Sequence, residues 1–164
     1  MYTIEQIEDA ITTRLAPLKV GHEGTEPDPP AVWRTVRTIK SYQGELDDEE
    51  SIARATKLFP AILAVYGGSE YASHGARKVE KMRFHLFVCD RSLRAEEEAR
   101  RGGSGNPGVY ALLNGVRDLL VGQRLSLEIY PFELSREEAV WFGKGISIYG
   151  ALYETAQPHL YPGG

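Results

Sequence analysis

Three glycines near the middle of the chain have a spacing that could hold a phosphate group. Gly103, Gly105 and Gly108 match the pattern GxGxxG and stand directly before a segment with helical periodicity. A phosphate cradle needs backbone N–H groups that point at the anion from a tight strand-to-helix turn. Here the charged segment 91–101 follows the strand instead, and Pro107 removes one donor. The pattern favours a flexible linker before a helix. A small nucleotide-binding or enzymatic α/β domain using the Gly103–Gly108 loop is the alternative.

Other residues with reactive side chains lack the spacing of a catalytic or metal centre. The four histidines are scattered without ligand spacing, and the single cysteine has no second cysteine to pair with. The acidic run 45–50 lacks the glycine and terminal glutamate of a calcium loop, so we interpret it as the first turn of a helix, where carboxylates complement the helix dipole. No nucleophile elbow surrounds a serine or Cys89. The sequence predicts no catalytic residue, cofactor or metal, although a site assembled from distant residues stays open.

The last third of the chain contains the clearest structural elements. Apolar residues recur every three or four positions over Val109–Leu120, which places them on one stripe of a helix. Gly122 ends that helix, and the alternation over Leu125–Ile129 predicts a strand with one buried face. A second alternation, over Ile146–Leu152, predicts a terminal strand. These elements are typical of a domain built to pack.

The first two thirds predict a helix and several strands. Thr3 and Gln6 form a plausible capping box for the first helix. The buried stripe of this helix is Ile4, Ile7, Ile11, Leu15 and Leu18. A polar loop at 22–30 and a strand at Ala31–Tyr42 follow, and then a short helix to about Leu58. The next predicted elements are a buried central strand AILAVYGG, a hairpin or flap at 69–81 and a strand MRFHLFVCD.

This order predicts a single α+β domain over residues 1–164, with a mixed, mainly antiparallel β-sheet and two main helices packed on one face. Flexible segments are expected near 21–31 and 91–107, and a loose tail after about 156. The helix at Val109–Leu120 should pack on a sheet that includes Ile62, Leu63, Val65, Leu86 and Val88.

Composition narrows the class of protein. The chain has 164 residues, of which 42% are hydrophobic and 26% charged, and these fractions are typical of a globular domain. Its net charge of −4 argues against a dedicated nucleic-acid binder with a basic face. Cys89 lies in an apolar run, so we expect a buried, inert thiol in a reducing compartment. The sequence shows neither a signal peptide nor a stretch of roughly 20 apolar residues that could span a membrane.

Six stretches spread along the chain together match the pattern of a known family: IEQIEDAITTRL, IKSYQGEL, FPAILAVYGG, FHLFVCDRSLRAEEEARRG, GVYALLNGVRDLLVGQRL and GISIYGALYETA. They resemble the Mu-type phage tail terminator family, a family of Mu-like prophage tail proteins that was formerly a domain of unknown function. The resemblance spans about Ile4 to Thr155 and departs from the family pattern at 21–32 and 69–81.

The resemblance implies a structural virion protein without enzyme activity. Tail terminators form a ring, usually of six copies, that caps the tail tube and joins it to the neck or head-completion proteins. In a contractile tail they also touch the sheath. The partners implied are the chain itself, the tube protein, the sheath protein and the neck protein, with genome DNA passing through without specific binding. The implied location is the tail–neck junction of the virion, after assembly in the host cytoplasm.

A ring needs two different surfaces on each copy, because one edge must fit the opposite edge of the next copy. We expect these surfaces at the strand Ala31–Tyr42, at the terminal strand and at the charged loop, whose arginines would lie away from the channel wall. A solvated loop is the alternative for the arginines, and packing against a helix for the tyrosines. The residues expected at interfaces are Arg34, Arg37, Arg91, Arg94, Arg100, Arg101, Tyr149 and Tyr153.

Overall fold

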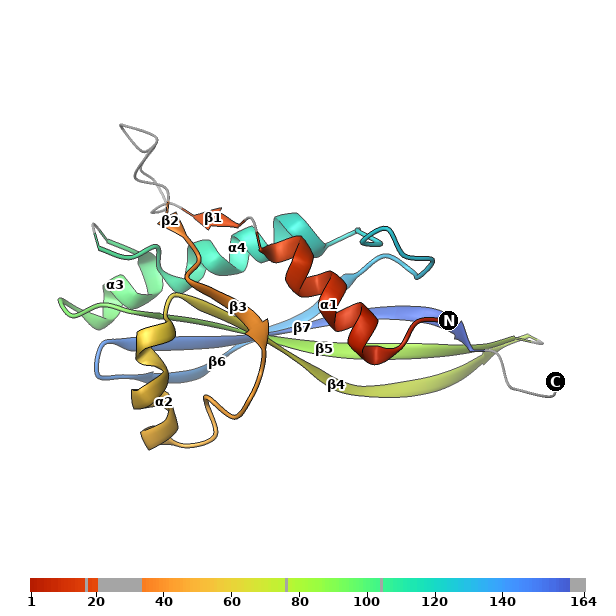
Figure 1. Ribbon diagram of the computed structural model, residues 1–164, viewed down its shortest axis with the longest axis horizontal. Helices are drawn as coiled ribbons and strands as arrows, with labels where there is room; N and C mark the ends of the chain where they lie inside the picture. The colour runs from red at the N-terminus through yellow and green to blue at the C-terminus, as the bar shows by residue number, and fades with distance from the viewer. Residues whose placement is uncertain (17, 21–33, 76, 104, 160–164) are drawn as a thin grey trace.

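The computed structural model describes residues 1–16, 18–20, 34–75, 77–103 and 105–159 (Figure 1). Its elements are α1 (Ile4–Leu15), β1 (Lys19–Val20), β2 (Arg34–Thr35), β3 (Thr38–Ser41), α2 (Glu49–Ala55), the 3-10 turn η2 (Thr56–Leu58), β4 (Ala61–His74), β5 (Arg77–Arg91), α3 (Glu96–Arg101), α4 (Val109–Leu120), β6 (Glu133–Gly143) and β7 (Ile146–His159).

The centre of the fold is a five-stranded sheet in the order β3-β4-β5-β7-β6. Only β3 and β4 run parallel, and the other neighbours pair antiparallel. In Figure 1, α1 and α4 lie on one face of this sheet, and α2 lies on the other face near one end. The predicted class, an α+β domain with a mixed and mainly antiparallel sheet, is confirmed.

Two hydrophobic clusters lie on the two faces of the sheet. The larger one joins α1 and α4 to inward residues of the strands, including Ile62, Leu86 and Val88 as predicted. Leu63, which was expected in the same cluster, packs instead under α2 with Cys89. The reason is the alternation of a strand, which sends neighbouring side chains to opposite faces. Val65 is only half-buried and belongs to neither cluster.

Both main helices begin where the sequence predicts. α4 covers Val109–Leu120, and its stripe is buried as expected. α1 has the predicted capping box, in which the Thr3 side chain accepts from the Gln6 N–H and the Gln6 side chain accepts from the Thr3 N–H. Ile4 was expected in the buried stripe but is 38% exposed, because the first turn of α1 extends past the core.

The strand expected at Leu125–Ile129 is wrong. Leu125 and Ser126 have φ of +54° and +61°, a left-handed conformation that a strand cannot contain. The Leu127 N–H closes a turn on the carbonyl oxygen of Arg124 at 2.9 Å. Ile129 still enters the core, at 3% exposed, so the apolar alternation reports burial rather than strand pairing.

The strand expected over Ala31–Tyr42 is broken, and residues 31–33 lie outside the described part of the chain. The Val36 N–H donates to the Leu18 carbonyl, so β2 pairs with β1 and only β3 joins the main sheet. The short helix expected from the acidic run 45–50 to about Leu58 begins only at Glu49 and is split into α2 and η2. Segment 69–81 is a hairpin formed by β4 and β5, as one of the two predicted alternatives had it.

Cys89 is 0% exposed, and burial raises the pKa of its thiol above the ordinary value. A thiol that is both buried and protonated reacts poorly with electrophiles. We expect a maleimide reagent to leave the native protein unlabelled and to label one site after denaturation. Rapid labelling of the native protein, measured by mass spectrometry, would contradict this burial.

None of the helices in the described ranges combines the length and the apolar character needed to cross a membrane.

Candidate functional site

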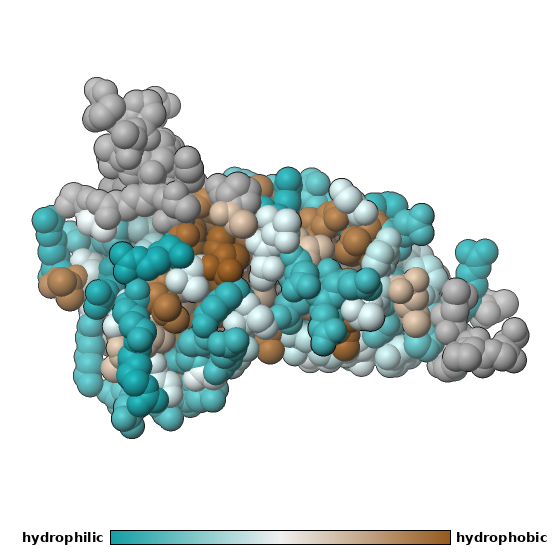
Figure 2. Space-filling model, viewed as in Figure 1, coloured by the Kyte–Doolittle hydropathy of each residue, from teal (hydrophilic) through white to brown (hydrophobic). Residues whose placement is uncertain are grey.

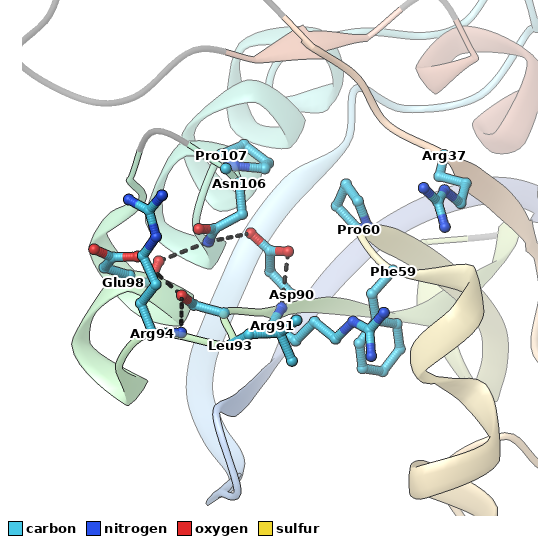
Figure 3. Close-up of a pocket in the computed structure, with 12 residues that line it drawn as sticks. Arg37, Phe59, Pro60, Asp90, Arg91, Leu93, Arg94, Glu98, Asn106 and Pro107 are labelled. Carbon is cyan, nitrogen blue, oxygen red and sulfur yellow. Dashed lines mark hydrogen bonds between the residues drawn. The ribbon is translucent and has the colours of Figure 1, made fainter.

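Three of the predicted interface arginines come together at one cavity. Arg37, which precedes β3, meets Arg91 and Arg94 from the end of β5 around a hollow of about 400 Å³ (Figure 3). Phe59 and Pro60 form an apolar part of its wall. The segments involved lie far apart in the sequence, and the parallel pairing of β3 with β4 brings them to the same end of the sheet.

The buried carboxylate of Asp90 organises this cavity. Asp90 is 1% exposed, and its hydrogen-bond donors include the Gly108 N–H at 2.7 Å, the Asn106 amide at 3.0 Å and the Arg91 N–H at 2.8 Å. The Asn106 amide also donates to the carbonyl oxygen of Glu98 at 2.7 Å. The charged segment is therefore hydrogen-bonded to the last residues of β5, as the dashed lines in Figure 3 show.

This geometry explains the glycine pattern without a nucleotide. The Gly108 N–H at the start of α4, which would face a phosphate, donates to Asp90 instead. A Cβ on Gly108 would lie 2.3 Å from the Gly102 nitrogen, and the residue has φ of +86°. Glycine is thus required for close packing of the chain, and an internal carboxylate takes the place that the nucleotide-binding alternative would give to a phosphate. The predicted helix start is confirmed; the flexibility of 91–107 stays a prediction.

The arginines around the cavity point in different directions. The Arg37 guanidinium donates to the Lys57 carbonyl at 2.9 Å, and Figure 3 shows the Arg91 side chain extending toward the Phe59 ring. The Arg94 side chain runs toward Glu98 on the other side. All three are exposed. Such a rim can contact carboxylates on another protein, since guanidinium groups match carboxylate geometry.

The other predicted interface arginines lie elsewhere. Arg101 is exposed on α3 and pairs with Glu97 at 3.2 Å, one helical turn away. The Arg100 guanidinium carbon lies 5.5 Å from the centre of the Phe142 ring of β6, a cation–π contact within the chain. Arg34 lies in β2, and its side chain falls outside the described part of the structure.

The two tyrosines of β7 differ in a way the sequence did not indicate. Tyr149 is half-buried between Tyr110 and Phe142, whose ring centres lie 6.0 Å and 5.5 Å away. Tyr153 is 0% exposed inside the larger core cluster. A fully buried side chain cannot meet another subunit, so the expected interface role of Tyr153 is wrong. β7 is also not an edge strand, because it lies between β5 and β6.

Sequence reasoning missed three exposed apolar side chains. Leu93 is 92% exposed between two arginines of the cavity rim, and Val140 and Phe142 on β6 are 46% and 44% exposed. A lone leucine in a charged segment was the available signal. Figure 2 shows that this face is largely hydrophilic, with apolar residues gathered over the region of β3.

An ion-pair network on the sheet makes stability depend on pH. The Lys81 ammonium, 2.9 Å from Glu154, and the Arg83 guanidinium at 3.2 Å lower the pKa of that carboxyl below 4.5, although burial opposes them. A lowered folded-state pKa contributes stability above the unfolded-state pKa that is lost as pH falls through the folded-state pKa. We expect Glu154→Gln to be less stable than wild type in urea at neutral pH. The gap should close well below pH 4.5; a constant gap would contradict the pairing.

No group of three or more histidine, cysteine or carboxylate residues in the described part of the chain could hold a metal ion.

Comparison with known proteins gives the family. The model of the family described as Bacteriophage Mu, Gp37, matches residues 3–157. The chain belongs to that family. None of the curated proteins compared with it matches. Among solved structures, it is similar to a chain described as "Virion of native gene transfer agent (GTA) particle", with a TM-score of 0.52 at 13% sequence identity, over 97% of this chain and 100% of that one. The likeness shows a shared fold. This Mu Gp37 family member accordingly belongs to a Mu-like phage tail family.

Proposed function

We propose that this Mu Gp37 family member is the tail terminator of a phage, a ring that caps the tail tube and joins it to the neck. The observation that carries the proposal is the family match over residues 3–157, which agrees with the terminator-like phrases spread along the sequence. The fold shared with a virion chain over 97% of the present chain supports the same role. In a contractile tail the ring also contacts the last ring of the sheath.

The sheet offers what a closing ring requires. Its two outer strands, β3 and β6, each pair with a single neighbour and lie at opposite edges. Strand edges with open backbone groups tend to pair with other chains, and two different edges on one subunit suit a head-to-tail contact that closes into a ring. Six copies is the stoichiometry we propose, at the tail–neck junction of the virion.

A subunit with a net negative charge suits a channel through which DNA slides. The net charge of −4 would hold the phosphate backbone weakly, whereas a lumen lined with arginines would retain it. We therefore place the arginine-rimmed cavity away from the channel, against a neighbouring copy, the tube or the sheath.

Removing the protein from its phage tests the function itself. We expect lysates without it to contain tail tubes of uncontrolled length and heads without tails, as seen by negative-stain electron microscopy. Tubes of normal length that join to heads in the absence of the protein would contradict the proposal.

Charge reversal on α3 tests whether the charged segment is an interface. We expect Arg100→Glu with Arg101→Glu to reduce the yield of joined particles at least tenfold, while the subunit stays folded by circular dichroism. Arg54→Glu is the matched control, since Arg54 on α2 pairs with Glu50 one turn away and is 67% exposed, much as Arg101 is 68% exposed. Normal particle yield from the double variant would leave the segment as solvated surface.

A further inference from the structure

We infer that Leu93 of one copy inserts into an apolar groove at the opposite end of the sheet of a second copy. This inference deepens the proposed function and rests on it, because it names a contact between neighbouring copies of the proposed ring that lies at the ends of the strands, apart from the outer strands β3 and β6. The argument starts from Leu93, which is 92% exposed, the largest fraction of any large apolar side chain in the described residues. It lies directly beyond the end of β5, flanked by Arg91 and Arg94.

A leucine held so far out contributes nothing to the stability of its own subunit. Burying a leucine side chain against a partner is worth about 1.5–3 kcal/mol relative to leaving it in water. Two hydrogen bonds hold the residue before it: the Ser92 N–H donates to the Gly145 carbonyl at 2.8 Å, and the Ser92 hydroxyl donates to Glu98 at 2.9 Å. Leu93 thus follows a residue that is hydrogen-bonded to the rest of its subunit, and this lowers the conformational entropy that Leu93 would lose on docking.

The groove that fits it lies between the β4–β5 hairpin and the start of β6. It has a volume of about 350 Å³, and its apolar wall consists of Ala72, Val79, Tyr130, Pro131 and Ala156. Tyr130 is 51% exposed, and Ala72 is exposed as well. The groove and Leu93 are both apolar and both exposed to solvent, so a contact between them would remove apolar surface of each from water.

The two surfaces cannot meet within one chain. Val79 lies near the start of β5 and Leu93 follows its end, and the strand between them advances about 40 Å at roughly 3.3 Å per residue. A contact between them therefore joins two copies. Because the surfaces differ, the contact is head-to-tail, the kind that can close into a ring.

Charge favours the same pairing. Lys81 and Arg83 already hold Glu154 at the groove, whereas Glu133 at its edge is exposed and takes part in none of the ion pairs found among the described residues. A leucine carried between Arg91 and Arg94 would bring the exposed Arg91 guanidinium near that carboxylate, whereas the Arg94 side chain runs toward Glu98 of its own chain. Opposite charges beside an apolar contact select the orientation of docking more than they add to affinity.

Cross-linking between two variants that each carry one added cysteine tests the contact. We would mix the full-length Leu93→Cys protein with the Ala72→Cys protein and add a short bis-maleimide, for which the buried Cys89 thiol is a poor target. The expected result is a covalent dimer in the mixture, at least tenfold above either variant alone. The matched control replaces Ala72→Cys with Glu5→Cys, an exposed position on α1, and should give no dimer.

The ring and the contact are scored separately. The mass of the uncross-linked protein is measured in the same samples. A closed ring without the Leu93–Ala72 cross-link overturns this contact and leaves the proposed function standing. A cross-link to Glu5→Cys as strong as to Ala72→Cys also overturns it. Absence of both ring and cross-link overturns the contact and the proposed ring together.

A second pair of variants tests the charge pairing. Arg91→Glu with Arg94→Glu should weaken the cross-link, and Glu133→Arg in the partner should restore it. A cross-link that is not restored overturns the charge pairing.

Discussion

Replacing Leu120 with alanine should lower the free energy of unfolding by about 2–5 kcal/mol. Leu120 is 0% exposed, and its side chain closes the last turn of α4 against the larger core cluster. Removing three carbon atoms there forfeits their burial and leaves a cavity that the long, paired strands cannot easily fill by relaxing. Urea unfolding followed by circular dichroism at 25 °C measures the change.

The neighbouring residue provides the control. Val121 ends the same helix but is 45% exposed, so Val121→Ala should change the stability by less than about 0.5 kcal/mol. Equal midpoints for Leu120→Ala and wild type would mean that α4 buries a different face.

The second large effect is expected at Asp90. Replacing it with alanine leaves the Gly108 N–H, the Asn106 amide and the Arg91 N–H without their buried acceptor. Hydrogen bonds to a charged group contribute about 1.5–3 kcal/mol each, and a buried donor left unpaired costs about 1–3 kcal/mol. Because these contributions are not additive and the loss of Asp90 also removes the cost of burying its charge, we expect a total loss of about 3–5 kcal/mol, and faster proteolysis within 101–108.

Two variants separate this role from a general effect of charge. Asp90→Asn keeps one acceptor oxygen and should lose less stability than Asp90→Ala. Asp118→Ala removes an exposed carboxylate from α4 and should be nearly neutral. If Asp90→Ala unfolded at the same urea concentration as Asp118→Ala, the carboxylate would not be what holds the charged segment to the sheet.

Local patterns predict the helices and the β4–β5 hairpin well because those elements are stabilised by nearby contacts. The capping box of Thr3 and the stripe of α4 are written in residues three and four apart. The errors fall where a distant contact decides the backbone. Leu125 and Ser126 adopt positive φ although apolar and polar residues alternate there as in a strand. The Val36 N–H donates to the Leu18 carbonyl rather than to a strand of the main sheet.

The sequence could predict which residue types form the candidate interface, but not where in the fold they lie. Charge patterning singles out the arginines, yet it cannot show that Arg37 joins Arg91 and Arg94, since that depends on the parallel pairing of β3 and β4. The strand order is likewise invisible in a single sequence. It places β7 inside the sheet, which buries Tyr153 and moves the open edge to β6.

The most direct test of the account is the mass of the assembled protein. Mass photometry of the purified chain, alone and with tail tubes, should show a single closed species of six subunits, and cryo-electron microscopy of tails should place it at the head-proximal end of the tube. A protein that stays monomeric both in solution and on the tube would contradict the proposed ring, and with it the proposed function.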